Sequence, residues 1–373
     1  MSKNAWIRIT LSLVITALLS FNLINCNGEE GRITIGATLP LSGDAAAWGK
    51  NTQEGIELAL QEINASGGVL GKQIVVVYED TQALPKEGVS AYRKLVSVDG
   101  VPAIIDDSVS GVTLAMAPMA EKDNVVILAT GATAPKISEA GEYIFRIWNS
   151  DAYEGEISAD YAFDTLGLRS VAILYINNEY GKGLEEVFKS RFESRGGNVP
   201  ISEAFGQNST DMRTQLSKIQ ASNPDGLYLV GYPKEIPIAL RQARELGLNV
   251  SLLGTVAMQD PQLLESAGYA AEGLMFPYPQ DPTGEQVDHF KQAFQKQYGK
   301  EPGITADVGY DAIKMIVIAI ELSGGTTGED IRIGLNMLKD YPGVSGTMTF
   351  DENGDVHKPM GIKIVEGGMF VWR

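Results

Sequence analysis

The chain contains very little cysteine and histidine for its length. Its 373 residues include one cysteine and two histidines. A single cysteine permits no intrachain disulfide and no Cys–Cys redox pair, and the two histidines add too few ligands for a Cys/His zinc cluster. The same scarcity removes most histidine-dependent acid–base catalysis. We therefore expect no metal site and no cofactor, and we favour binding over catalysis.

Positive charge is also scarce. The chain has 30 lysines and arginines against 47 aspartates and glutamates, a formal net charge of −17. Nucleic-acid binding depends on clustered positive charge, so this balance argues against a nucleic-acid partner. With 44% hydrophobic and 21% charged residues, the composition is that of a globular protein with room for two domains.

The common catalytic and nucleotide-binding motifs are missing. There is no P-loop and no G-x-S-x-G elbow, and Gly181-Lys182-Gly183 lacks the third glycine of a dinucleotide fingerprint. The acidic run 351–355 resembles the start of a calcium loop, but the sixth position is Val356. We interpret Asn353-Gly354 as a tight turn joining two strands. His289 and His357 are expected at the surface or in packing, and a secreted enzyme is the least favoured function.

The N-terminal segment has the pattern of an export signal. Lys3 and Arg8 precede an apolar run from Ile9 to Ile24, which is short for a membrane span. Cys26 follows in a context that resembles a bacterial lipobox, although Asn25 departs from the usual small residue. We expect residues 1–25 to be a signal peptide and Cys26 to be lipidated. The alternative is an ordinary secretory signal with an incidental cysteine, and both place the protein outside the inner membrane.

Buried apolar runs alternate with amphipathic helices in the rest of the chain. Ile33–Leu39 reads as a strand, and Ile56, Ala59, Leu60 and Ile63 then form one helical face. Continuous apolar strands separated by helices predict an α/β fold with parallel sheets covered on both faces. The further expected strands are 74–79, 103–106, 125–128, 170–176, 226–230 and 251–253, and the further helices are 87–97, 111–122, 183–195 and about 238–246.

The C-terminal part is too short for a third domain. Two helices are expected at about 285–298 and 306–322, followed by a hairpin-like stretch of Gly346–Phe350 and Met360–Val365. We expect these elements to complete two doubly wound lobes. The predicted division is a first lobe of residues 32–150 plus 279–357 and a second lobe of residues 151–278 plus 358–373.

Short motifs in a characteristic order run from Ile33 to the C-terminus. They are Ile35–Gly43, Trp48-Gly49, Glu54–Ala59, Ser110 with Thr113, Thr130–Pro135, Tyr180–Gly183, Leu240–Arg244 and Phe350–Asp355. The chain thereby resembles the leucine/isoleucine/valine-binding branch of the type I periplasmic solute-binding proteins. That resemblance implies two lobes joined by a three-segment hinge, a small-molecule ligand captured between them by hinge closure, and delivery to an ABC permease. It also implies a monomer on the periplasmic or cell-surface side of a membrane.

The resemblance also assigns one end of the ligand site. In that family, the residues matching Ser110 and Thr133 hold the carboxylate of an α-amino acid, and the position of Gly131 offers its carbonyl to the ammonium. Ser110 opens a helix, so its hydroxyl suits either a helix cap or an anion contact. Thr133 follows a strand, at the carboxyl edge where open α/β sheets bind ligands.

Three aromatic residues match positions that line the family's cleft, namely Trp48, Tyr180 and Tyr232. Such side chains cover an aliphatic or aromatic group and offer a polar atom at its edge. For each of them, ordinary packing is the alternative to a ligand contact.

One departure concerns the ammonium. Where the amino-acid binders of this family carry a glutamate, this chain has Val256. A buried ammonium without a carboxylate partner is costly. Asp106 and Asp107 are the candidate substitutes, with Asp260 a weaker one, and we select Asp107 for the site.

Three binding functions remain open from the sequence. The first is a transport-linked binding protein for an amino acid with an apolar side chain. The second is the same class of protein for a carboxylate or amide without an amine, such as an aromatic or short branched acid. The third is an exported sensor subunit that binds a ligand and contacts a receptor.

Overall fold

The computed structural model describes residues 31–373 except Asp44 and Ser108. The expected signal peptide and Cys26 lie outside the described residues. Within the part of the chain that is described, no helix combines the length and apolar character that a membrane crossing requires.

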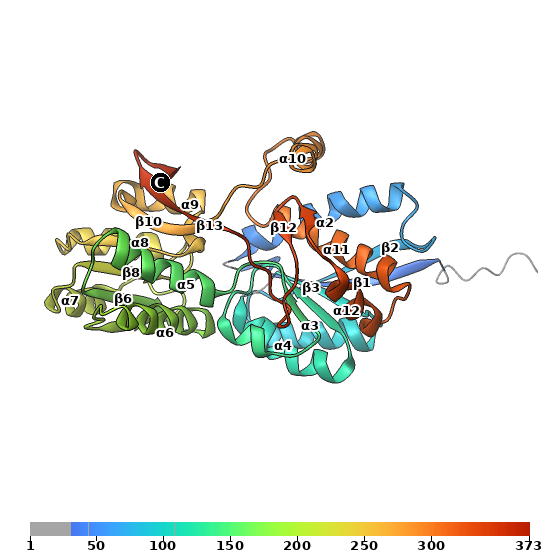
Figure 1. Cartoon of the computed structure of the whole chain (residues 1–373), viewed down its shortest axis with the longest axis horizontal. Helices are drawn as coiled ribbons and strands as arrows, with labels where there is room; N and C mark the ends of the chain where they lie inside the picture. Colours follow the sequence, from blue (N-terminus) through green and yellow to red (C-terminus); the bar gives the residue numbers. More distant parts are fainter. Residues whose placement is uncertain (1–30, 44, 108) are drawn as a thin grey trace, which may run out of the picture.

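The first half of the molecule is built on a parallel five-stranded sheet (Figure 1). Its strand order is β2-β1-β3-β4-β5, with β1 Arg32–Leu39, β2 Gln73–Asp80, β3 Ala103–Asp106, β4 Val126–Ala129 and β5 Ile144–Arg146. Strands β3 and β4 are buried along their whole length, as expected for apolar runs inside a parallel sheet. The order changes direction between β1 and β3, which places a ligand-binding crevice at the carboxyl ends of these strands.

Helices cover both faces of this sheet. On one face, Ile104 packs with residues of α3 (Pro85–Ser97) and α4 (Ser110–Asp123). On the other face, Ile105 joins a core made with α2 (Ala46–Ala65), α10 (Glu285–Tyr298), α11 (Ala306–Ser323) and α12 (Gly328–Met337). Gly55 permits the close contact of α2 with α11, because a Cβ there would lie 1.9 Å from the Ala306 carbonyl oxygen.

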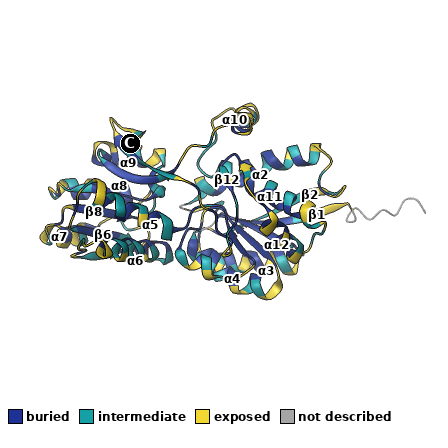
Figure 2. Ribbon diagram, in the orientation of Figure 1, coloured by how far each residue is buried: buried dark blue, intermediate teal, exposed yellow. Residues whose placement is uncertain are grey.

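The second half is built on a seven-stranded sheet with the order β14-β13-β10-β9-β8-β6-β7. The strands are β6 Val171–Ile176, β7 Ser202–Phe205, β8 Gly226–Val230, β9 Ser251–Leu253, β10 Leu274–Pro279, β13 Met360–Glu366 and β14 Met369–Trp372. Strands β10, β9, β8, β6 and β7 pair in parallel, in that order. Strand β13 pairs antiparallel with β10, and β14 pairs antiparallel with β13. Its helices are α5 Asp151–Asp160, α6 Glu179–Ser194, α7 Arg213–Ala221, α8 Ile236–Glu245 and α9 Pro261–Ala267. Figure 2 shows that the strands are buried between the helices, and that the outer faces of the helices are exposed.

The prediction of two doubly wound parallel sheets is confirmed, but the C-terminal hairpin prediction is wrong. Strand β12 (Gly346–Met348) pairs with β11 (Tyr341–Gly343), whereas β13 pairs with β10 and β14. The Asn353-Gly354 turn does not join two paired strands. It closes on Asp351, whose Oδ1 accepts hydrogen bonds from the backbone N–H groups of Asn353 and Asp355.

Three segments of chain pass from one half to the other: 147–150, 280–284 and 349–359 (Figure 1). They are hydrogen-bonded to one another where they cross. The Asn149 side chain donates to the Lys358 carbonyl at 2.9 Å and accepts from the Lys358 N–H at 2.7 Å. Gln280 N–H donates to the Pro359 carbonyl at 2.9 Å. The lobe boundaries given above stay a prediction.

Candidate functional site

A cleft lies between the two sheets at their carboxyl edges. It encloses about 750 Å³ of empty space, its open mouth included, which is within the usual range for a small-molecule site. The structure brings all seven predicted ligand-site residues together in its lining, and their binding role stays a prediction. They are Trp48, Asp107, Ser110, Gly131, Thr133, Tyr180 and Tyr232.

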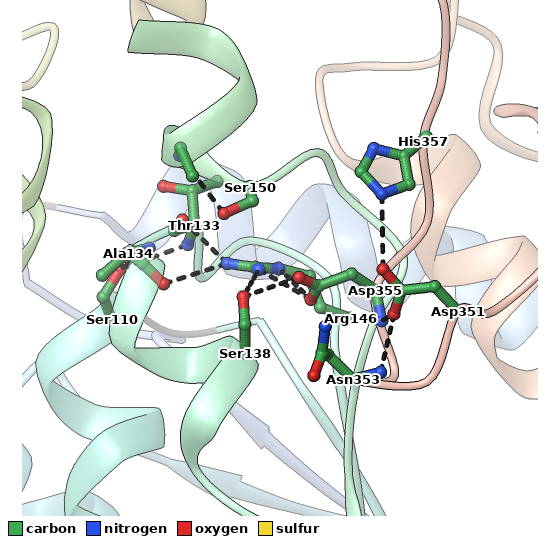
Figure 3. Close-up of polar contacts among 11 residues, drawn as sticks. Ser110, Thr133, Ala134, Ser138, Arg146, Ser150, Asp351, Asn353, Asp355 and His357 are labelled. Carbon is green, nitrogen blue, oxygen red and sulfur yellow. Dashed lines mark hydrogen bonds and ion pairs between the residues drawn. The ribbon is translucent and has the colours of Figure 1, made fainter. Parts of the chain in front are cut away.

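Ser110 and Thr133 come from adjacent strand ends of the first half. Ser110 begins α4 after β3, and Thr133 lies in the loop after β4. The Ser110 Oγ accepts hydrogen bonds from the backbone N–H groups of Thr133 at 3.2 Å and Ala134 at 3.1 Å (Figure 3). The alternative of a helix cap is wrong for Ser110, because Val109 is the N-cap and no described side chain caps α4. The Ser110 hydroxyl thus accepts from the loop after β4 and lies at the start of α4, where a helix N-terminus suits an anion.

Arg146 fixes the loop that carries Thr133. Its side chain is fully buried and donates from Nη1 to the carbonyl oxygens of Thr133 (2.7 Å) and Ala134 (3.0 Å) (Figure 3). Its Nε and Nη2 both donate to Asp355 Oδ1, at 3.0 and 2.6 Å. Nη2 also donates to Ser138 Oγ. Sequence reasoning missed this residue, whose only signal is a charge at the end of an apolar strand.

Aromatic side chains from both halves line the rest of the cleft, with Trp48 from α2 of the first half and Tyr180 and Tyr232 from the second. Tyr180 and Tyr232 stack with ring centroids 5.4 Å apart, and Trp48 meets Tyr232 edge-on at 6.1 Å. The Tyr180 hydroxyl donates to Thr255 Oγ1 at 2.8 Å, and Asn178 Nδ2 donates to the Tyr232 hydroxyl at 3.1 Å. Burial raises the pKa of both tyrosines, so both stay neutral.

Two further aromatic residues in the lining, Trp148 and Tyr278, were not predicted. They contact each other edge-on at 6.2 Å. Trp148 lies in the first crossing segment, and Tyr278 lies near the end of β10, just before the second. Nothing in their local sequence pattern relates them to a site, because only the assembled crossing brings them to the cleft.

The three acids suggested by the sequence have different positions. Asp107 lines the cleft, and its carboxylate accepts hydrogen bonds from Thr52 Oγ1 (2.6 Å) and Thr130 Oγ1 (2.9 Å). Burial raises the pKa of Asp107, and these two hydroxyls partly oppose that shift. Asp106 and Asp260 are outside the lining. Asp106 accepts hydrogen bonds from two buried threonine hydroxyls, and Asp260 accepts one from Trp48 Nε1 at 3.2 Å.

Two buried acids in the first turn of α5 were missed. Asp151 and Glu154 are both fully buried. Glu154 Oε1 accepts the backbone N–H of Val256 at 2.9 Å, and Val256 lines the cleft. Burial raises the pKa of Asp151 to about 7 and raises that of Glu154 well above its usual range, with the charge of Asp151 adding to the effect on Glu154. Acids are common in the first turn of a helix, so the sequence did not distinguish these two.

The metal-ligating residue types are dispersed. Over residues 31–43, 45–107 and 109–373, no group of three or more His, Cys, Asp or Glu side chains is placed to hold a metal ion. His289 contacts Glu62 and His357 contacts Asp351, and both histidine side chains are exposed, as predicted.

The comparisons with known proteins agree with this architecture. The chain belongs to the periplasmic binding protein family, whose model matches residues 32–368. It is 28% identical over 331 residues to the Leu/Ile/Val-binding protein homolog 3 of Brucella melitensis, covering 88% of this chain and 89% of that protein.

Two solved structures of solute-binding proteins have the same fold. The leucine binding protein LivK of Thermotoga maritima is 31% identical with a TM-score of 0.85, covering 91% of this chain and 97% of that one. A solute binding protein of an ABC transporter from Rhodopseudomonas palustris, in complex with 3,4-dihydroxybenzoic acid, is 25% identical with a TM-score of 0.79. That match covers 91% of this chain and 95% of the other.

Proposed function

We propose that this protein captures an amino acid with an apolar side chain in the cleft and delivers it to an ABC permease. The observation that carries the proposal is the cleft itself, where hydroxyl donors and Trp48 of the first half face Tyr180 and Tyr232 of the second. The names of the Brucella and Thermotoga proteins, which refer to leucine and related residues, support the same ligand class.

The donor side fits the carboxylate of the ligand. The hydroxyls of Ser110 and Thr133, together with the first N–H groups of α4, offer donors to an anion at a helix N-terminus. These donors are local, which matters because a chain of net charge −17 does not attract anions at long range.

The ammonium of the ligand needs an acceptor in the same cleft. Asp107 is the acid of the three sequence candidates that lines it, and the Gly131 carbonyl is the second acceptor that we assign. The apolar side chain of the ligand then packs against Trp48, Tyr180 and Tyr232.

Ligand capture requires closure, because the two walls belong to different halves. A ligand that contacts both walls stabilises the closed arrangement over an open one. The crossing segments 147–150, 280–284 and 349–359 are the hinge in this proposal.

A second candidate ligand is a carboxylate without an amine. Val256 presents an apolar side chain to the cleft, and the aromatic lining suits an aromatic acid as well as an aliphatic chain. The Rhodopseudomonas protein was solved with an acid of this kind. A sensor subunit would use the same cleft, and genes for a permease and an ATPase beside this one would favour transport.

A thermal-shift screen of the purified protein tests the ligand class. Amino acids are compared with their deaminated acids, because a ligand that binds only the folded state raises the melting temperature, and does so more as its concentration exceeds its Kd. We expect shifts from leucine-like amino acids. Shifts from the acids alone would exclude the amino-acid function and support the second candidate.

The two donor residues are tested in the same assay. We expect Ser110→Ala and Thr133→Ala each to weaken binding about tenfold, since each removes one hydroxyl donor to a charged group. Retained binding in both variants would remove these residues from the site.

Lipidation of Cys26 is a separate part of the proposal. The lipid would hold the exported protein at a membrane surface beside its permease. We expect Cys26→Ser to move the protein from the membrane fraction to the soluble fraction of cells. An unchanged membrane fraction would contradict the anchor.

A further inference from the structure

The inner end of the cleft is closed by a thin partition. Tyr278, Ile304 and Thr305 line the cleft on one side and a second cavity on the other. This second cavity is a groove of about 860 Å³, its open side included, and the apolar side chains of Val287 and Phe290 form part of its wall. A single layer of residues therefore separates the ligand site from further space that an apolar chain could occupy.

The partition is made by both halves of the molecule. Ile304 and Thr305 directly precede α11 of the first half, and Tyr278 lies near the end of β10 in the second. Thr305 is fixed by its side chain, because Oγ1 donates to the Trp48 carbonyl oxygen at 3.0 Å. Tyr278 is the largest of the three shared residues and the one that the second half contributes.

The Tyr278 ring is held on several sides. Trp148 meets it edge-on at 6.2 Å. The Lys363 ammonium lies 4.5 Å from the centroid of the Tyr278 ring and 4.4 Å from that of the Trp372 ring, so one cation contacts two aromatic rings. Gly361 pairs with Tyr278 between β13 and β10 and leaves room for the indole, because a Cβ at Gly361 would lie 2.8 Å from Trp372.

Lys363 is a buried cation with a distant counter-ion. Its side chain is buried, and its ion pair with the exposed Asp281 has a length of 3.9 Å. Burial lowers the pKa of Lys363, and the charge of Asp281 partly opposes that shift. The same carboxylate accepts a hydrogen bond from Trp372 Nε1 at 2.9 Å. The cation and the two rings therefore form one packed unit behind the cleft.

We propose that Tyr278 is a specificity-determining residue: its ring, positioned by Lys363, closes the inner end of the cleft and limits the length of the apolar chain that a ligand can carry. The inference rests on the proposed function, because it concerns a ligand whose apolar part lies in the cleft. It deepens that function by setting an upper size, and it applies to amino acids and to deaminated acids alike. Removal of the Tyr278 ring would join the cleft to the groove behind it.

Two series of unbranched ligands test the length limit. One consists of L-norvaline, L-norleucine, L-2-aminoheptanoic acid and L-2-aminooctanoic acid, and the other of pentanoic, hexanoic, heptanoic and octanoic acid. Binding to the purified protein is measured by titration calorimetry for the wild type, Tyr278→Ala and Tyr278→Phe. The phenylalanine variant is the matched control, because it keeps the ring and its contact with Lys363.

We expect wild-type binding to strengthen from five to six carbons and to be at least about tenfold weaker at eight, because overfilling a closed site costs strain. Tyr278→Ala is expected to bind the eight-carbon ligand at least about tenfold more tightly than the wild type does, since each methylene that enters the apolar groove favours binding about fourfold. Tyr278→Phe keeps the wild-type order of affinities. A misfolded variant cannot produce such a gain of binding.

Lys363 is tested as a positioning residue with the same ligands. Lys363→Met keeps an apolar stem but removes the cation, and we expect it to bind the eight-carbon ligand about threefold more tightly than the wild type does. Lys363→Arg restores a cation beside the rings and with it the wild-type limit. The control is Lys314→Met, which removes a cation 4.2 Å from the Tyr310 ring, outside the cleft lining. A purely structural Lys363 would lower the melting temperature without changing the order of affinities, and that result would contradict the positioning role.

Several outcomes overturn the inference while the proposed function stands. Wild-type affinity that keeps rising up to eight carbons is one, and an eight-carbon affinity of Tyr278→Ala within about threefold of the wild type is another. A length limit that is lost in Tyr278→Phe would also contradict the inference, because the ring is still present. Circular dichroism checks folding, and Tyr278→Leu, with a smaller apolar side chain and the same expected gain, replaces Tyr278→Ala if that variant does not fold.

The two series also separate this inference from the proposed function. A length limit observed with the deaminated acids alone would support the inference and contradict the amino-acid function. Wild-type protein that binds neither series contradicts both.

Discussion

At the residue scale, Arg146 has the largest number of roles. It is fully buried, neutralises Asp355 of the third crossing segment and holds the carbonyl oxygens of the cleft loop at Thr133 and Ala134 (Figure 3). One guanidinium thus connects a candidate ligand contact to the segment that joins the halves. The planar fork of arginine suits this arrangement, which lysine could not reproduce.

Replacing Arg146 by methionine is expected to lower the free energy of unfolding by about 3–5 kcal/mol, because Asp355 then remains buried without its partner. Urea unfolding measures the change. The control is Arg213→Met, which removes an exposed pair with Glu245 and should cost less than about 1 kcal/mol. Equal losses in the two variants would show that the Arg146 pair contributes no more than a surface contact.

At the element scale, the first turn of α5 lowers the stability of the folded state by an amount that depends on pH. The pKa of Asp151 is raised to about 7 by burial, so between its ordinary pKa of 3.8 and about 7 the folded state keeps a proton that the unfolded state loses. The stability contributed by Asp151 therefore falls as pH rises through this window and is constant above it.

Asp151→Asn removes that dependence. We expect the variant to gain about 3 kcal/mol of stability relative to the wild type between pH 4.5 and pH 7.5, because most of the raised-pKa window lies between these values. Urea unfolding at the two pH values gives the difference. A stability difference that does not change with pH would contradict a raised pKa at Asp151.

The elements also show how far sequence reasoning reaches. The alternation of apolar strands and helices predicted both parallel sheets, because a continuous apolar run indicates a strand that is buried on both faces of its sheet. It did not predict that β13 pairs with β10, since the paired residues are far apart in the chain, from Pro279 with Met360 to Met275 with Ile364. The seven predicted site residues lie together because they follow strand ends. Trp148, Tyr278 and Glu154 reach the cleft region only through tertiary structure.

At the scale of the whole molecule, side-chain contacts outside the crossing segments also join the two halves, among them the edge-on contact of Trp48 with Tyr232. Trp48 Nε1 donates to Asp260 across the cleft at 3.2 Å, and Lys136 pairs with Glu179 at the surface. An exposed ion pair contributes little to stability. Without a ligand, opening of the cleft therefore costs few direct contacts.

Small-angle scattering of the purified protein tests whether the cleft closes when a ligand binds. We expect the radius of gyration to fall when a ligand from the thermal-shift screen is added, because the ligand favours the closed arrangement. Trp48→Phe, which removes the hydrogen bond to Asp260, should increase the radius of the ligand-free protein. Identical radii with and without a bound ligand would contradict closure.

The three crossing segments also determine when the chain can fold. The first half needs α10, α11 and α12 from residues 285–337, and the second sheet is completed only by residues 360–372 at the C-terminus. Until those residues are available, β10 keeps an open edge and α2 lacks its partner α11. Neither half can therefore reach its native state before most of the chain has been synthesised. Both halves are therefore expected to form late, and a partly synthesised chain leaves apolar sheet and helix faces without the segments that cover them.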